Sequence, residues 1–377
     1  MSAVIQIYRQ SLDHLLAPVV PYLQDPAVSE VMINGHDEIY VERHGKVQRV
    51  AARFADPASL RAAARNITQY AGKRLDPDIP SIEARLPDGS RVHILQPPAA
   101  RRGLCIAIRK FSQHRLRLRE LIERDALSRE AAEFLAISVR LAKNLIVSGG
   151  TGSGKTTLLN CLSEAIPQEA RIVVIEDATE LQLQQEHVVP LEAQPADRHG
   201  RGGISIRELF RASLRMRPDR IIVGECRGGE ALDMIQAMTS GHAGSMSTCH
   251  ANGPLDALNR LETMALMSGV EMPLLALRSQ LISAVDLIVQ IVRQRDGGRR
   301  ISQITEVLKT EDRDRYQLRD IFRLDMSRGV GGEGGRGELV WTGTRPTFGS
   351  ELRERGDVRW ARLSARLWQI PVATVEG

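Results

Sequence analysis

The sequence predicts an α/β protein with a parallel-rich β-sheet covered by helices, preceded by a smaller α+β domain. From residue 144, short apolar runs alternate with helical segments, which is typical of a parallel sheet with helical crossovers. Before residue 112, strand-like segments follow one another through turns and enclose a helix. We expect an N-terminal domain at 1–111, a linker at 112–127, a second domain at 128–327, and a glycine-rich break with a tail at 328–377.

The N-terminal domain is predicted from turn and cap signals. The segment EVMINGHDEIYVERHGKVQRV reads as strands joined by glycine turns. Asp56 followed by Pro57 is a helix cap and a first-turn proline, so we expect a helix from there to about Gly72. The sequence Pro87-Asp88-Gly89 predicts a hairpin between RL and RVHIL, and LCIAIRK is a further strand.

The second domain is predicted from five apolar runs and one cap. Residues Phe111 to Asp125 are arginine-rich and read as the connection, and Ser128 is a suitable N-cap for the next helix. The predicted strands are NLIVSGG, RIVVIED, DRIIVGE, GSMSTCHA and VDLIVQIV. The stretch RGVGGEGGRGE near residue 328 indicates a break, and the tail after it holds all three tryptophans, so we expect it to dock on the protein.

Composition indicates a cytosolic globular protein. Of the 377 residues, 42% are hydrophobic and 26% charged, and the longest apolar runs are far shorter than a membrane helix needs. The beginning of the chain lacks the pattern of a signal peptide. Four cysteines without a CxxC pair suit reduced thiols. The net charge of +5 allows an anionic partner, but the aromatic content of 4% disfavours a base-stacking nucleic-acid surface.

A phosphate-binding loop is the strongest motif. It fits the pattern GxxxxGK[ST] in full, follows the strand NLIVS and precedes the helical segment TTLLNCLSEAI. Its backbone N–H groups would converge on phosphate oxygens, Lys155 would neutralise the β- and γ-phosphates, and the Thr156 hydroxyl would ligate Mg²⁺. The predicted phosphate-binding residues are Gly149, Gly150, Thr151, Gly152, Ser153, Gly154, Lys155, Thr156 and Thr157.

Three other predicted strands carry polar groups at their carboxyl ends, where open parallel sheets bind ligands. They are Glu176, Asp177 and Glu180 after RIVVI, Glu225 after RIIVG, and His250 after SMSTC. We expect Glu225, helped by Glu176, to orient or deprotonate the attacking water. Glu180 and Asp177 suit a salt bridge or a cap equally well.

The stretch SGHAGSMSTCHAN raises the alternative of a zinc site. His242, Cys249 and His250 are possible ligands, but no nearby side chain supplies a fourth one cleanly. A histidine at a strand end beside a phosphate-binding loop can instead hydrogen-bond the γ-phosphate. We interpret His250 as that sensor and His242 as its partner, although a structural role suits His242 better than His250; Cys249 is expected to be a packed small hydrophobe.

Two groups of arginines are candidates for phosphate contacts. Arg207, Arg211 and Arg215 repeat every four residues beside an apolar helix face, a pattern explained either by solvation or by facing carboxylates or phosphate. Arg85, Arg91 and Arg109 flank the predicted hairpin or end a strand. One or more of these could reach a nucleotide across a domain or subunit boundary, as an arginine finger does.

Together, several segments resemble the four boxes of the type II/type IV secretion ATPases: GGTGSGKTT, IEDATELQL, and LRMRPDRIIVGECRGGEALDMIQAMTSGHAGSMSTCHAN. In order, these look like the Walker A, aspartate, Walker B and histidine boxes. The segments INGHDEIYVERHGKV, EARLPDGSRVHILQPP, NRLETMALMSG and SAVDLIVQIVRQRDGGRRISQITEV are similar to the tight-adherence (Flp) pilus assembly branch, the CpaF/TadA-like group. Cys226, Cys249 and the loop SGHAGS depart from the usual pattern without removing a box.

The resemblance implies a RecA-like P-loop ATPase domain, with an N-terminal domain closing over it, that binds ATP and Mg²⁺. It implies a homohexamer on the cytoplasmic face of the inner membrane, attached to a pilus or secretion platform protein, with no obligatory nucleic acid. By motif, the site residues it implies are Lys155, Thr156, Glu176, Glu180, Glu225, His242, His250, Arg85, Arg91 and Arg109.

The expected function is ATP hydrolysis that powers pilus assembly or protein secretion. The first alternative is a conjugation or type IV secretion ATPase, which shares every box. A RecA-like nucleic-acid motor and a nucleotide-binding regulator without turnover are further alternatives. The arginines cluster around the nucleotide boxes rather than along a strand path, and the presence of Glu225 and His250 favours turnover.

Overall fold

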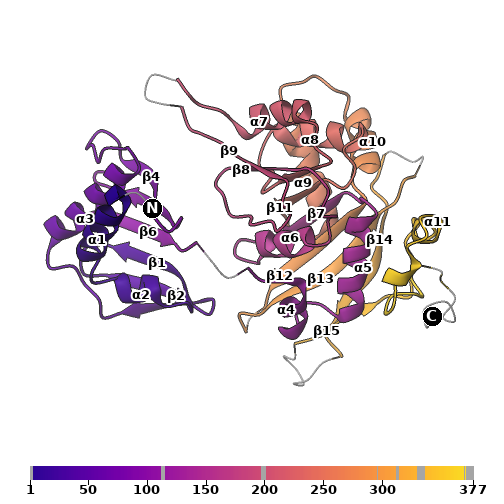
Figure 1. Cartoon of the computed structure of the whole chain (residues 1–377), viewed down its shortest axis with the longest axis horizontal. Coiled ribbons are helices and arrows are strands. Elements are labelled where there is room, and N and C mark those ends of the chain that lie inside the picture. The colour runs from indigo at the N-terminus through magenta and orange to yellow at the C-terminus, as the bar shows by residue number, and fades with distance from the viewer. Residues whose placement is uncertain are drawn as a thin grey trace. The chain divides into compact units, whose positions relative to one another are not determined.

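The computed structural model divides into two compact units, Met1–Arg115 and Leu116–Gly377 (Figure 1). The division falls inside the segment 112–127 that was predicted as a linker. Most of the predicted glycine-rich break lies outside the described residues. The structure describes residues 3–111, 115–196, 201–294, 296–310, 314–328, 336–368 and 370, with side chains in the first helix from Tyr8 onward.

The first unit contains a six-stranded antiparallel sheet in the order β3-β2-β1-β6-β5-β4. Its strands are β1 (Val28–Asn34), β2 (Ile39–Arg43), β3 (Lys46–Val50), β4 (Ser81–Arg85), β5 (Arg91–Leu95) and β6 (Cys105–Arg109). Its helices are α1 (Ala3–Leu15), α2 (Val20–Gln24) and α3 (Pro57–Tyr70). The predicted strands, hairpin and helix are confirmed. The Asp56 side chain caps α3 by accepting the Ser59 backbone N–H at 2.7 Å.

The second unit contains a nine-stranded sheet in the order β15-β14-β13-β12-β7-β11-β10-β8-β9. Six strands, β12, β7, β11, β10, β8 and β9, are parallel to one another. Strands β13, β14 and β15 continue the sheet beyond β12, and each is antiparallel to its neighbour. The bounds are β7 (Leu145–Gly149), β8 (Ile172–Glu176), β9 (Val188–Glu192), β10 (Arg220–Val223), β11 (Met246–His250), β12 (Leu287–Arg293), β13 (Arg299–Val307), β14 (Leu318–Asp325) and β15 (Glu338–Trp341). The predicted fold class and all five predicted strands are confirmed; β9 and the antiparallel extension were not predicted.

Helices cover both faces of this sheet, because its parallel strands are buried on both sides. The helices are α4 (Leu118–Glu123), α5 (Arg129–Arg140), α6 (Lys155–Ser163), α7 (Ile206–Ser213), α8 (Glu230–Thr239), α9 (Pro254–Leu266), α10 (Leu274–Ala284) and α11 (Glu351–Glu354), with 3₁₀ turns at Leu214–Met216 and Val358–Trp360. Helices α4 to α6 and the tail pack on one face, and α7 to α10 pack on the other. The Ser128 side chain caps α5, as predicted.

The C-terminal tail docks on the second unit, as its tryptophans predicted. Trp368 is fully buried, with its ring 5.4 Å from that of Phe134 on α5 and 6.0 Å from that of Phe348. Its indole N–H donates to the Ser364 hydroxyl at 3.0 Å. The side chain of Glu133 accepts the backbone N–H of Ser364 at 2.8 Å. The tail is therefore part of this hydrophobic core.

Candidate phosphate-binding and catalytic site

The glycine-rich loop follows β7 and leads directly into α6, as predicted. Gly152 and Gly154 have φ angles of 67° and 97°, a region that residues with a Cβ rarely occupy. A Cβ on Gly149 would lie 2.3 Å from the carbonyl oxygen of Ile291 on β12, so this position also requires glycine. The loop thus forms a backbone cradle at the N-terminal end of α6, where the helix dipole favours an anion.

Lys155, the first residue of α6, has a buried side chain. Its Nζ donates to the Gly150 carbonyl at 3.1 Å and lies 3.3 Å from Nδ1 of His250. The ammonium group therefore links the loop to the end of β11. A buried ammonium, a backbone cradle and the neighbouring Thr156 hydroxyl fit the phosphates of a nucleotide with its Mg²⁺ ion.

The carboxyl ends of the parallel strands meet at this loop, as predicted. Ile175 near the end of β8 pairs with Val223 of β10, and Val223 pairs with Ser247 of β11. His250 at the end of β11 pairs with Gly149, the first residue of the loop. These pairings place Glu176, Glu225 and His250 at one edge of the sheet.

A basic side chain lies against each carboxylate oxygen of Glu225. Oε1 is 2.7 Å from Nε2 of His250. Oε2 accepts from Nε and Nη2 of Arg227 at 2.8 and 2.5 Å, and Nη1 of Arg227 reaches Asp177 at 3.2 Å. Arg227 therefore bridges the carboxylates that follow β8 and β10. Arg227 was not predicted as a site residue, although its position two residues after Glu225 was a usable signal.

The pKa of His250 lies below its ordinary value of 6.5, mainly because partial burial disfavours the imidazolium. The positive charges of Lys155, Arg227 and Arg260 lower this pKa further, and the charge of Glu225 acts in the opposite direction. The lowered pKa makes the imidazole neutral near pH 7. A neutral imidazole can both accept and donate a hydrogen bond.

Glu176 holds the loop that follows β8. Its side chain is buried, and Oε1 accepts the backbone N–H groups of Glu180 and Leu181 at 2.8 and 3.0 Å. Its Cγ packs against Gly224, where a Cβ would lie 2.8 Å away. This geometry suits a positioning role, whereas Glu176 was predicted to assist Glu225 at the attacking water. A catalytic role for the Glu180 side chain stays a prediction.

His242 precedes β11, and this strand runs from there toward the loop and ends at His250. The predicted contact of His242 with a nucleotide stays a prediction. An extended strand rises roughly 3.3 Å per residue, so the two histidines lie at opposite edges of the sheet. The backbone N–H of His242 donates to Ala237, and its carbonyl accepts from the Ser245 hydroxyl. A structural role suits this position.

The arginines on α7 face a carboxylate, which was one of the two expected explanations. Arg207 and Arg211 donate to the two oxygens of Asp233 on α8 at 2.7 and 2.8 Å. Arg207 also donates to the Ser268 carbonyl. This pairing ties α7 to α8 and offsets the repulsion between the two arginines. The side chain of Leu214 is exposed in the 3₁₀ turn after α7.

Arg85, Arg91 and Arg109 form one row across three strands of the first unit. Arg85 pairs with Arg91 across β4 and β5, and Arg91 pairs with Arg109 across β5 and β6. The next partner in the row is Glu30 on β1. The row lies on the sheet face opposite the buried residues Ala84 and Val92, as the strand alternation requires. Their predicted contact with a nucleotide stays a prediction.

Two further arginines that the sequence analysis did not single out lie beside the glycine-rich loop. Ile291 of β12 pairs with Gly149, so Arg293 at the end of β12 falls at the same sheet edge. Arg299 opens β13, and its Nε donates to the Gly152 carbonyl at 2.9 Å. Open parallel sheets bind ligands at the carboxyl ends of their strands, so the predicted strand VDLIVQIV could have indicated Arg293, which follows it directly.

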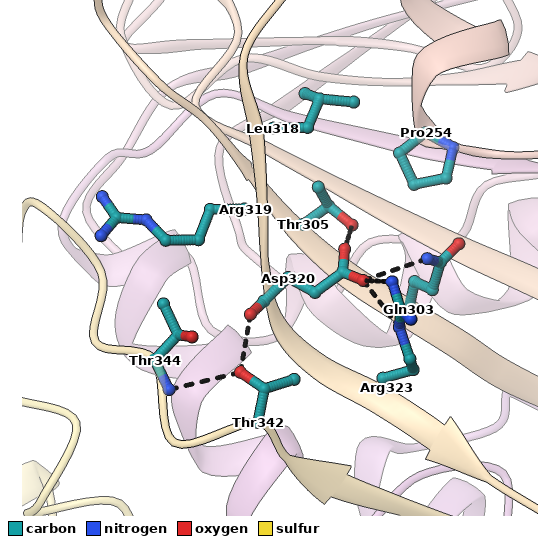
Figure 2. A pocket seen from close by; sticks show the side chains of 9 residues that line it. All are labelled: Pro254, Gln303, Thr305, Leu318, Arg319, Asp320, Arg323, Thr342 and Thr344. Atoms are coloured by element: carbon teal, nitrogen blue, oxygen red, sulfur yellow. Dashed lines mark hydrogen bonds and ion pairs between the residues drawn. The ribbon is translucent and has the colours of Figure 1, made fainter.

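A separate groove of about 620 Å³ opens over the antiparallel strands (Figure 2). Its lining residues are Pro254, Gln303, Thr305, Leu318, Arg319, Asp320, Arg323, Thr342 and Thr344. Asp320 accepts hydrogen bonds from Thr305, Gln303 and Arg323. Because this carboxylate is satisfied within the protein, the cluster suits stability better than ligand binding.

The helices of the described segments are all too short or too polar to cross a membrane.

Comparison with known proteins connects this site to one family. The family described as "Type II/IV secretion system protein" matches residues 13–318. A candidate conjugal transfer protein of Mycobacterium tuberculosis is 36% identical over 299 residues, which cover 78% of this chain and 84% of that protein. The PtlH homologue of Bordetella bronchiseptica, a type IV secretion system protein, is 36% identical over 317 residues, which cover 77% of this chain and 93% of that protein.

A solved structure supports the fold. The crystal structure of the pilus retraction motor PilT with bound ADP is similar, with a TM-score of 0.55 and 18% sequence identity. The similarity covers 82% of this chain and 82% of that one. At this identity, the likeness shows the fold alone.

Proposed function

The chain belongs to the type II/IV secretion system protein family, and from that premise we propose that it is a hexameric motor that powers assembly of a tight-adherence (Flp) pilus. The family membership makes it an ATPase of the P-loop class. The observation that carries the proposal is the meeting of Lys155, Glu225 and His250 at one sheet edge beside the glycine-rich loop. The Flp branch rests on the sequence segments that resemble it.

We assign the phosphate contacts to the loop and to α6. The backbone N–H groups of the cradle and the ammonium of Lys155 would hold the β- and γ-phosphates of ATP. The Thr156 hydroxyl would bind the Mg²⁺ that neutralises charge on these phosphates. Thr157, next in α6, would add its backbone N–H to the same cradle.

Glu225 is the proposed base that orients or deprotonates the attacking water. Its carboxylate lies beside the end of β11, and Arg227 fixes its direction through two hydrogen bonds. His250, neutral near pH 7, would hydrogen-bond the γ-phosphate and register its loss. Glu176 would keep the loop after β8 in place. Each role follows from what the side chain touches.

The dependence of ATPase activity on protein concentration tests the ring. If neighbours complete each site, activity per subunit rises steeply with concentration, and the Glu225→Gln variant is inactive at every concentration. Activity that is independent of concentration contradicts the ring. Adding single-stranded or duplex DNA is a second arm, because stimulation by DNA would favour a nucleic-acid motor instead.

The arginine row suggests how a neighbour could contribute. Three guanidinium groups stand at neighbouring positions across β4, β5 and β6, and guanidinium groups suit the recognition of a phosphate. We propose that one of Arg85, Arg91 and Arg109 serves the ATP site of an adjacent subunit. An inactive arginine variant mixed with inactive Glu225→Gln subunits then regains activity, because some interfaces have both groups intact. A mixture that stays inactive for all three arginines contradicts this proposal.

A type IV secretion or conjugation ATPase is the second candidate, favoured by the names of the two 36% identical relatives. Deleting the gene separates the candidates. Loss of surface pili with normal plasmid transfer supports the pilus motor, and the reverse result supports the alternative. In both cases we propose that the protein acts at the cytoplasmic face of the inner membrane through a platform protein, and cell fractionation with and without that membrane partner tests this location.

A further inference from the structure

The β12–β13 hairpin packs closely against the glycine-rich loop. The Cδ atom of Arg299 lies 3.1 Å from the place that a Cβ on Gly154 would take. Nη1 of Arg293 lies 3.7 Å from the corresponding place on Gly152. The side chains of Arg293 and Arg299 therefore both lie close to the glycine-rich loop of the same chain. They belong to the second unit, unlike the arginine row of the first unit.

Register explains why two arginines meet here. Arg293 and Arg299 are directly opposite each other in the antiparallel pair β12–β13. Two guanidinium groups at the same sheet edge raise the local positive potential beside the loop, which favours an anion there. Asp296, the acid of the turn, accepts the Gly298 N–H and lies 3.7 Å from Arg336.

The hydrogen bond from Arg299 fixes one peptide plane of the loop. Nε of Arg299 donates to the Gly152 carbonyl at 2.9 Å. The carbonyl and the N–H of a trans peptide point in opposite directions, so the N–H of Ser153 turns toward the inside of the loop. There it lies 3.4 Å from the Gly150 oxygen, which also accepts from Lys155. Arg299 therefore helps keep the cradle in its phosphate-binding shape.

We propose that Arg293 and Arg299 complete the nucleotide site within the same chain, with Arg293 contacting the phosphates of a nucleoside di- or triphosphate and Arg299 positioning the loop. The proposal rests on the proposed function, because it requires that the glycine-rich loop bind a nucleotide. Since the loop would hold ADP and ATP alike, the two arginines contribute to nucleotide affinity. An arginine that stabilises the transition state would instead change kcat.

Nucleotide affinity of four variants of the full chain tests the proposal. The probe is a fluorescent ADP, with unlabelled ATP as competitor, and kcat is measured in parallel. We expect Arg299→Gln to weaken binding by about tenfold and Arg293→Gln by about three- to tenfold, because each removes a charged contact. Arg299→Lys should remain weakened because lysine lacks the planar Nε donor. The matched control is Arg328→Gln, which removes an exposed arginine paired with Asp325 at the end of β14.

Ionic strength separates the two roles. The loss in Arg293→Gln should shrink at high salt, since exposed charges are screened, while the loss in Arg299→Gln should persist. Affinities within twofold of wild type in both glutamine variants would overturn the proposal. If wild type binds nucleotide and Lys155→Ala does not, such a result leaves the ATPase function intact. If wild type itself fails to bind either nucleotide, the proposed function falls together with this inference.

Discussion

The edge of the parallel sheet and the groove over its antiparallel extension use charged residues in different ways. In the groove, Asp320 is surrounded by Thr305, Gln303 and Arg323 and accepts hydrogen bonds from all three (Figure 2). At the parallel edge, Lys155 contacts a carbonyl oxygen and the imidazole of His250 beside an open backbone cradle. The groove therefore stabilises the sheet, whereas the parallel edge is built for a ligand. The presence of a charged residue does not distinguish the two regions, but the hydrogen-bond partners around that residue do.

Replacing the base at the parallel edge should give the largest effect. We expect Glu225→Gln to lower kcat by about 100- to 1000-fold, because the variant keeps the shape of the side chain and loses the proton acceptor. Nucleotide affinity should stay close to that of wild type. Steady-state kinetics and nucleotide titration measure both quantities. A kcat within threefold of wild type would exclude Glu225 as the base.

Removing the carboxylate of the groove should affect stability without affecting chemistry. We expect Asp320→Ala to lower the free energy of unfolding by about 1–3 kcal/mol, because the buried Thr305 and the half-buried Gln303 lose their acceptor. Denaturant titration followed by tryptophan fluorescence suits this test, since all three tryptophans belong to the second unit. The kcat of the folded variant should match wild type; a large fall in kcat would mean that the groove takes part in the reaction.

The pH dependence of kcat probes His250. Its pKa is lowered from 6.5, so the neutral form persists to a more acidic pH than in a free histidine. If the neutral form is the working one, kcat is constant near pH 7 and falls about tenfold per pH unit once the pH passes below the lowered pKa. The variant His250→Gln should be slow and should lack this acidic fall. A wild-type rate that rises on acidification would contradict a neutral sensor.

The smallest effect is expected on α7. Arg211 pairs with Asp233, but its side chain is more than half exposed, so Arg211→Gln should cost less than about 1 kcal/mol of unfolding free energy. ATPase activity should be unchanged, because this arginine faces a carboxylate of α8. A strong loss of nucleotide affinity in this variant would restore the phosphate-binding explanation of the arginine pattern.

The parallel core was predictable because its strands are continuous apolar runs and its loop has a specific motif. The run NLIVS predicted a strand, and the motif GGTGSGKT after it predicted phosphate binding at the end of that strand. Strands β13 to β15 were not predicted, since their residues alternate irregularly and hold polar side chains such as Thr305 and Asp320 inside the sheet. The position of these strands depends on their pairing with β12 and with one another, and a short stretch of sequence does not reveal that pairing.

The residues of the site also divide into those that local sequence indicates and those that only strand pairing brings together. The positions of Lys155, Glu225 and His250 were predictable because each stands at or just after a strand or helix end that the pattern located. The separation of His242 from His250 could not be read from the motif, because it depends on the strand that lies between them. Arg299 enters the site from the far strand of a hairpin, and only the register between β12 and β13 brings it there.

The buried tail has a consequence for how the protein is made. Residues 134 and 368 touch in the core of the second unit, so that core cannot close until nearly the whole chain described here has left the ribosome. The first unit closes its own sheet within Met1–Arg115 and can fold much earlier. Until the tail is made, the apolar face that Phe134 shares with the tail therefore stays uncovered.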